Sequence, residues 1–140
     1  MSAAGQGGMR DPFPGLEHLG SATPFVGRIQ EIIQHIHLFE DFEAEEIAAL
    51  ARDLVCYRAP AGAVIIREGD QGDFMLIVLD GQCEIVKNDP TGVPKRIGLA
   101  GPGKTLGEMS MIDGEPRFAS CVALEDTLFA MLDRDSLSHI

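Results

Sequence analysis

The side chains best suited to bind a charged ligand lie in one short stretch, residues 106–120. Gly107 permits close approach of the backbone to a ligand because it has no Cβ. Glu108 can accept a hydrogen bond from a hydroxyl group, and Arg117 can hold phosphate oxygens through two parallel N–H donors. A short helix beginning just after Gly107 would also direct free N–H groups toward an anion. These groups together are what a sugar phosphate needs.

The elements expected around this stretch are mostly short strands. From residue 55 onward, apolar runs alternate with Gly, Asp, Asn and Pro at intervals of about eight to twelve residues, which is typical of sandwiches and barrels. Asp80 and Gly81 form a strong signal for a two-residue hairpin. We expect strands at residues 54–58, 63–67, 73–79, 82–87, 96–100, 117–123 and 127–132.

Helices are expected at both ends of the strand region. Isoleucines recur at helical spacing in one segment, and an apolar stripe follows an acidic first turn in the next, which suits the helix dipole. The expected helices are residues 26–37, residues 43–54, one or two turns at residues 108–113, and a last helix starting near residues 133–136. The fold class is therefore mainly β, an antiparallel double-stranded β-roll (jelly-roll-like) with N-terminal helices, a short helix after Gly107 and a C-terminal helix.

Composition indicates one globular domain. Residues 1–24 are rich in Gly, Ala, Ser and Pro without a hydrophobic period, so we expect a flexible lead followed by one domain over residues 25–140. The chain is 45% hydrophobic and 24% charged, as is usual for soluble proteins. No apolar run approaches the roughly 18–20 residues of a membrane span, and the start does not look like a signal peptide. We expect a cytoplasmic protein without membrane insertion.

Charge and cysteine content exclude other classes. The formal net charge is −11 with only 11 Lys and Arg, which argues against binding nucleic acid, because that requires neutralising phosphates. The three cysteines are an odd number and scattered, which favours neither a disulfide framework nor a zinc site.

Three blocks of the sequence resemble, in the same order, the cyclic nucleotide-binding domain family. The family's phosphate-binding cassette has a Gly-Glu pair, a short helix, and Arg-x-Ala-Ser/Thr about nine residues after the Glu. Here Arg117 follows Glu108 by nine positions and is followed by Phe118, Ala119 and Ser120. Residues 67–75 resemble the family's turn and third strand, and residues 80–85 resemble its central hairpin. The resemblance covers roughly residues 38–140.

The resemblance implies a role for each cassette position. Glu108 would bind the ribose 2′-hydroxyl of cAMP or cGMP, and Arg117 would bind the cyclic phosphate. Backbone N–H groups near Met109 and Ser110 and at Phe118 and Ala119 would complete the phosphate cradle. Gly107 and Ser120 also belong to the expected ligand-binding residues. The apolar residues that would line the sugar and base side are Ile85, Ile97, Ala100 and Cys121.

The chain departs from the family pattern in two places. The family usually has a small residue or Thr where this chain has Phe118, so a large ring here could stack on the purine, narrow the site or block it. Family members also cap the base with a C-terminal helix, but only 23 residues follow Arg117. We therefore expect that helix to be absent or incomplete.

Two functions are compatible with these features, and a third is not. The first is a regulatory module that binds a cyclic nucleotide and transmits its presence by helix rearrangement to an unidentified output, with no cofactor besides the ligand. The second is a scaffold that has lost the ligand and serves interaction or dimerisation, for which the stripe on residues 26–37 could pair two copies. An enzyme of the metal-dependent cupin type is not expected, because His18, His35, His37 and His139 all lie in the lead or the helices.

Overall fold

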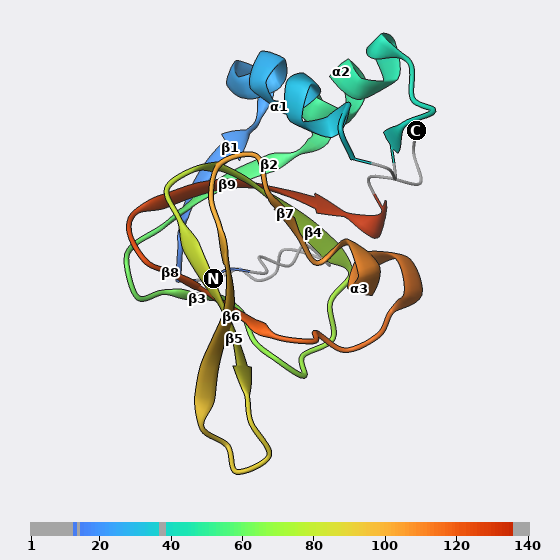
Figure 1. Ribbon diagram of the computed structural model, residues 1–140. Helices are drawn as coiled ribbons and strands as arrows, with labels where there is room; N and C mark the ends of the chain where they lie inside the picture. Colours follow the sequence, from blue (N-terminus) through green and yellow to red (C-terminus); the bar gives the residue numbers. More distant parts are fainter. Residues whose placement is uncertain (1–12, 14, 37–38, 136–140) are drawn as a thin grey trace, which may run out of the picture.

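The computed structural model describes residues 13, 15–36 and 39–135, and these residues form two antiparallel sheets with helices at one end (Figure 1). One sheet has the order β1 (Glu17–Ser21), β2 (Val55–Ala59), β9 (Thr127–Asp133), β4 (Phe74–Asp80) and β7 (Thr105–Leu106). The other has the order β3 (Val64–Ile66), β8 (Ser120–Ala123), β5 (Cys83–Asn88) and β6 (Pro94–Ala100). The predicted mainly β, antiparallel fold is confirmed.

The helices are a 3-10 turn η1 (Thr23–Phe25), α1 (Val26–Ile33), α2 (Ala44–Asp53) and α3 (Glu108–Asp113). The start of α2 is fixed by a capping box, in which the Glu43 amide donates to the Glu46 carboxylate at 2.8 Å. Helix α1 ends earlier than predicted because the chain tightens into a turn in which the Ile36 amide bonds to the Ile33 carbonyl. The predicted end of this helix, His37, lies outside the described residues.

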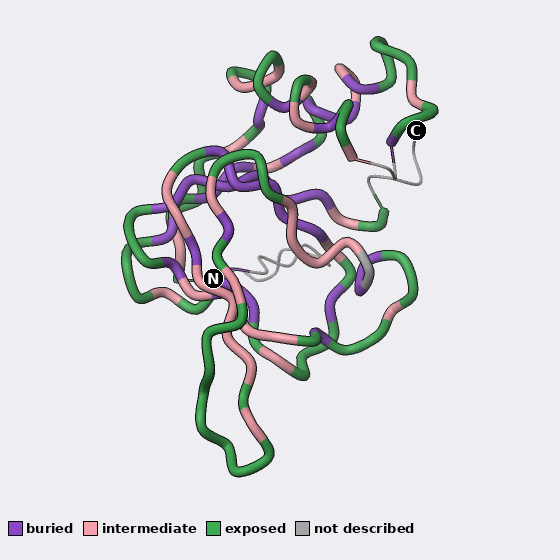
Figure 2. The backbone as a smooth tube through the Cα atoms, in the orientation of Figure 1, coloured by how far each residue is buried: buried purple, intermediate pink, exposed green. Residues whose placement is uncertain are grey.

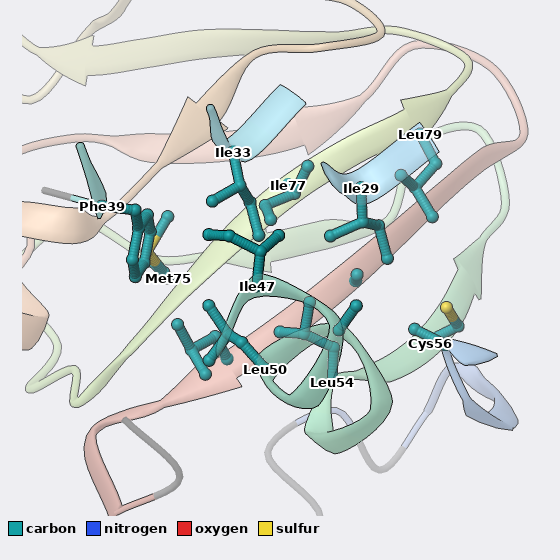
Figure 3. Packing of buried hydrophobic residues seen from close by; sticks show 14 of the residues in the cluster. Ile29, Ile33, Phe39, Ile47, Leu50, Leu54, Cys56, Met75, Ile77 and Leu79 are labelled. Atoms are coloured by element: carbon teal, nitrogen blue, oxygen red, sulfur yellow. The ribbon is translucent and has the colours of Figure 1, made fainter. Parts of the chain in front are cut away.

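The five-stranded sheet is covered on both faces. Along β4, Met75, Ile77 and Leu79 pack with the isoleucines and leucines of α1 and α2 (Figure 3). Leu76, between them in the sequence, points to the other sheet, because successive side chains of a strand alternate between its faces. Burial on both faces explains why β4 and β9 are almost continuously apolar.

A second apolar cluster fills the space between the two sheets. Its aromatic centre joins Phe13, Tyr57 and Phe129, with the Phe13 ring centroid 4.8 Å and 5.1 Å from the other two. Its buried members come from β2, β3, β4, β5, β8 and β9: Tyr57, Ala59, Ile65, Ile66, Leu76, Cys83, Cys121, Ala123, Phe129 and Met131. Strand β8, which follows the cassette, thus packs on this cluster through Cys121 and Ala123.

Further features differ from the sequence-based expectations. Strand β1 lies within the expected flexible lead and pairs with β2, so the lead contains an element that was not predicted. The strand expected from residue 117 begins only at Ser120, because the preceding residues form a loop bonded to the β3–β4 turn, with the Arg117 amide donating to the Asp70 carbonyl. Strand β9 extends to Asp133, and Arg134 and Asp135 after it have helical backbone; a complete C-terminal helix is not seen, since residues 136–140 of the predicted one lie outside the described residues.

The β5–β6 hairpin extends beyond the body of the domain and is largely exposed toward its tip (Figures 1 and 2). The opposite end carries α1 and α2. Ile29 and Ile33 of α1 are fully buried in the chain's own core, so this part of the stripe is not free to pair two copies. Within the described ranges, no helix is long and apolar enough to cross a membrane.

Candidate functional site

The predicted cassette lines a cavity of about 200 Å³ between α3, β5 and β8. Nine of the predicted site residues contribute to its wall: Gly107, Glu108, Ser110, Arg117, Phe118, Ala119, Ser120, Ile85 and Cys121. Two further apolar residues that the sequence analysis missed, Ile66 and Leu106, complete it. Ile66 belongs to the strand expected at residues 63–67, and Leu106 opens the stretch 106–120, but no motif distinguishes either from ordinary core residues.

Three predicted site residues are placed differently. Ile97 is 53% exposed and does not line the cavity, because the β5–β6 register shifts there: Ile85 pairs with Gly98 and Val86 with Arg96. The residue between those two partners, Ile97, therefore occupies a bulge. Ala100 is buried beside Cys83 but is also absent from the cavity wall. The backbone of Met109 belongs to α3, and its side chain lies outside the description.

Glycine allows the turn into α3. Gly107 has φ +84°, a left-handed conformation that side chains rarely adopt, and it caps the helix. Its carbonyl accepts a hydrogen bond from the Met111 amide at 3.1 Å. The N–H groups of α3 that precede Met111 are therefore the ones for which a helix provides no acceptor within itself. Because Gly107, Glu108 and Ser110 line the cavity, this end of α3 borders it.

Arg117 lies buried in the cavity wall, with only 5% of its surface exposed. Its Nη1 donates to the Gly107 carbonyl at 3.1 Å, and its Nη2 donates to the Phe74 carbonyl at 2.7 Å. The guanidinium carbon lies 4.5 Å from the centroid of the Phe74 ring, within the range of a cation–π contact. The side chain is therefore held in one place by β4 and by the cap of α3.

Two glycines leave the space that the guanidinium occupies. A Cβ on Gly72 would lie 2.1 Å from Arg117 Nε, and one on Gly107 would lie 2.3 Å from Nη1. Only a residue without a side chain fits at either position while Arg117 stays where it is. Gly72 lies within residues 67–75, which the sequence analysis compared with a turn and the following strand of the family, but nothing local in the sequence indicates its contact with Arg117.

The electrostatics at Arg117 reflect its burial. Burial lowers the pKa of the Arg117 guanidinium, and the nearby carboxylates of Asp73 and Asp70 partly oppose this shift. A buried cation loses hydration that two carbonyl oxygens replace only in part.

The second polar group of the cavity wall is Glu108. Thr105 Oγ1 lies 3.4 Å and 3.5 Å from its two carboxylate oxygens, which are long hydrogen bonds. Ser120 has a different partner: its hydroxyl accepts the Glu68 amide at 2.9 Å and so ties β8 to the β3–β4 turn. Glu108 is thus available to a ligand hydroxyl, while Ser120 is engaged in the fold.

Phe118 is not a core residue. It is 69% exposed and stands in the wall of the cavity, next to Arg117 in the sequence. The ammonium group of Lys87, on β5, lies 4.3 Å from the centroid of its ring.

Comparison with known proteins agrees with this geometry. The model of the cyclic nucleotide-binding domain family matches residues 57–140, more than half of the chain. A CRP-like cAMP-activated global transcriptional regulator of Mycobacterium tuberculosis is 30% identical over 78% of this chain and 49% of its own length. A cAMP-dependent protein kinase regulatory subunit of Aspergillus niger is 32% identical over 79% of this chain and 26% of its own length.

Among solved structures, a cyclic nucleotide-binding domain from Methylobacillus flagellatus has a TM-score of 0.82 and 43% identity, covering 94% of this chain and 74% of that one. The chain belongs to the cyclic nucleotide-binding domain family. It is homologous to regulatory domains that are not enzymes, and it spans about half or less of the length of these two curated relatives.

Proposed function

We propose that the chain is a regulatory module that binds cAMP or cGMP in the cavity beside α3. The observation that carries the proposal is Arg117, a buried guanidinium whose hydrogen bonds run to carbonyl oxygens inside a cavity that also presents Glu108. An anionic ligand would offset the cost of burying this cation. The cAMP-linked names of the matched regulator and kinase subunit support the same ligand class.

Each group has a defined task in this proposal. A guanidinium carries five N–H donors, so two carbonyl bonds leave donors for the cyclic phosphate. The early amides of α3 would share that phosphate, and Glu108 would accept the ribose 2′-hydroxyl. The apolar wall from Ile66, Ile85 and Leu106 would surround the sugar.

Two contacts of α3 support a route for transmission. Met111 is fully buried in the apolar cluster that also contains Ile29 and Ile33 of α1. Arg134, which follows β9, donates from Nε to the Met111 carbonyl at 2.7 Å. A ligand that moved α3 would therefore disturb both the N-terminal helices and the segment after β9, provided it bound the two arrangements with different affinities.

A ligand-free scaffold is the second candidate. The cavity of about 200 Å³ is smaller than the roughly 300–1,000 Å³ usual for small-molecule sites, which favours a domain that no longer encloses a nucleotide. The cytoplasmic location and the pairing of two copies through the helices stay predictions from the sequence.

Calorimetric titration with cAMP and cGMP, and with 5′-AMP as a non-cyclic control, separates the two candidates. The proposal predicts saturable one-site binding of at least one cyclic nucleotide and weaker binding of 5′-AMP. If neither cyclic nucleotide produces heat at concentrations that reveal an affinity of about 100 μM (roughly −5.5 kcal/mol), the result would favour the scaffold function over the binding function.

The role of Glu108 is tested with Glu108→Gln and 2′-deoxy-cAMP. Each change removes the same predicted hydrogen bond, so both single changes should weaken binding while the mutation adds little to the loss seen with the deoxy ligand. Independent, additive losses would show that Glu108 does not contact the 2′-hydroxyl.

A further inference from the structure

The exposed ring of Phe118 is held in a fixed position at the cavity wall. With 69% of its surface exposed, it is the most exposed large apolar side chain of the described residues. Lys87 Nζ lies over one face of the ring, 4.3 Å from its centroid. Because most of this ring is in water at the wall of a cavity, a ligand that covered it would bury apolar surface and gain binding energy from the hydrophobic effect.

The lysine that covers the ring is itself anchored. Lys87 Nζ donates to the Glu68 carboxylate and to the Phe118 carbonyl, both at 3.0 Å. The other carboxylate oxygen of Glu68 accepts the Asn88 amide at 2.9 Å. Charge-assisted bonds of this kind restrict the ammonium group and, through it, one face of the ring. The exposure of Phe118 leaves the rest of its ring accessible.

The size of the cavity determines what reaches this ring. A cavity of about 200 Å³ has room for a sugar phosphate rather than for a whole nucleotide, since sites for drug-sized ligands usually measure at least about 300 Å³. The polar groups for the phosphate and sugar, Arg117 and Glu108, lie in its wall. The base of a bound nucleotide must then extend to the edge, and Phe118 directly follows Arg117 in the sequence.

We propose that Phe118 is the residue that selects the base, by stacking its ring on the purine of a cyclic nucleotide whose sugar phosphate fills the cavity. This inference rests on the proposed function. Stacking on an aromatic side chain provides binding energy without an enclosing wall, and every base has a π-face. A purine offers the larger face, so cAMP and cGMP should bind more tightly than cCMP.

The test compares the parent chain with Phe118→Leu, which keeps an apolar side chain but removes the π-face, and Phe118→Tyr, which keeps it. Each is titrated with cAMP, cCMP and ribose 3′,5′-cyclic phosphate, which has no base. Because the side chain is mostly exposed, both variants should fold, and equal thermal unfolding midpoints would confirm this.

The stacking model predicts that Phe118→Leu weakens cAMP binding by about 5- to 150-fold, the range of base–aromatic stacking, and that Phe118→Tyr retains it. Binding of the base-free ligand should be the same in all three proteins. In NMR spectra, the adenine H2 and H8 signals should shift upfield on binding to the parent and to Phe118→Tyr, but not to Phe118→Leu.

Two results would overturn the inference while leaving the proposed function intact. One is equal cAMP affinity in the parent and Phe118→Leu. The other is base-free ligand binding to the parent as tightly as cAMP. If the parent binds none of the three ligands, the proposed function fails and the stacking role fails with it.

Discussion

Arg117 Nη1 donates a 3.1 Å hydrogen bond to the carbonyl oxygen of Gly107, the residue that caps α3. This bond joins the loop before β8 to the start of the cassette helix, although the two residues are ten positions apart. The second bond, from Nη2 to Phe74, extends the connection to β4. The groups that we propose to bind the phosphate are thus assembled by the fold itself, and a ligand would enter a site that is already largely formed.

Gly72→Ala should impair the site without touching the ligand. The new Cβ would lie 2.1 Å from Arg117 Nε, so the guanidinium would have to move and lose at least one carbonyl partner. We expect a loss of about 1–3 kcal/mol in unfolding free energy, the usual cost of overpacking, together with weaker cAMP binding. Urea unfolding and calorimetry measure the two effects.

Gly101→Ala is the matched control, because a Cβ there would meet nothing within 4 Å. It should change neither quantity appreciably. If Gly72→Ala behaved like this control, Arg117 would not depend on the space that Gly72 leaves.

Acidification should reveal the network at Glu68. The pKa of the Glu68 carboxyl lies below its ordinary value of 4.5, chiefly because the Asn88 amide donates to it, and also because Lys87 does. The folded chain therefore favours the ionised form, and on acidification the unfolded chain takes up the proton first. The stabilisation is complete above about pH 4.5 and is lost as the pH falls through the lower value of the folded state.

Glu68→Gln should therefore lower the thermal unfolding midpoint at pH 7, and the difference from the parent should shrink below about pH 4. Glu125→Gln, which alters an exposed carboxylate between β8 and β9, is the control and should leave the thermal unfolding midpoint at pH 7 close to that of the parent. A difference between Glu68→Gln and the parent that stays constant from pH 7 to pH 3 would contradict the assignment.

The cysteines should be unreactive in the folded chain. Burial raises the pKa of the Cys56 thiol to about 11, and a contact with Cys83 together with burial raises the pKa of Cys121. A hydrogen bond with Cys121 lowers the pKa of the Cys83 thiol, so this residue is protected by its burial alone. All three side chains are buried, so access of a reagent is blocked. A chromogenic disulfide reagent at pH 8 should label the native chain slowly and label three thiols at once in denaturant. Fast native labelling would show that the strands open readily.

Much of the fold was predictable because local signals agreed with the tertiary structure. The acidic start and apolar stripe placed α2 within one residue at each end, and Asp80 with Gly81 marked the hairpin that leads into β5. One element that was not predicted, strand β1, depends on its pairing partner in the folded structure. Strand β1 has no apolar period of its own and exists by pairing with β2.

In the site, too, features with a local sequence signal were predictable, and features that depend on distant residues were not. The spacing of Glu108 and Arg117 could be read from the sequence, since both belong to one short motif and both line the cavity. The exposure of Ile97 follows from a bulge in the β5–β6 register, which the sequence does not mark. The space left by Gly72 is defined only by a side chain 45 positions away.

The central claim is that Arg117 binds the phosphate of a cyclic nucleotide, and the most direct measurement is calorimetric titration of Arg117→Ala with cAMP. Arg96→Ala, which removes the same charge from an exposed position on β6, is the control, and circular dichroism checks that both fold. We predict that Arg117→Ala loses about 1.5–3 kcal/mol of binding free energy, the scale of a hydrogen bond to a charged group, while Arg96→Ala binds like the parent. Equal affinities of folded Arg117→Ala and the parent would contradict the account.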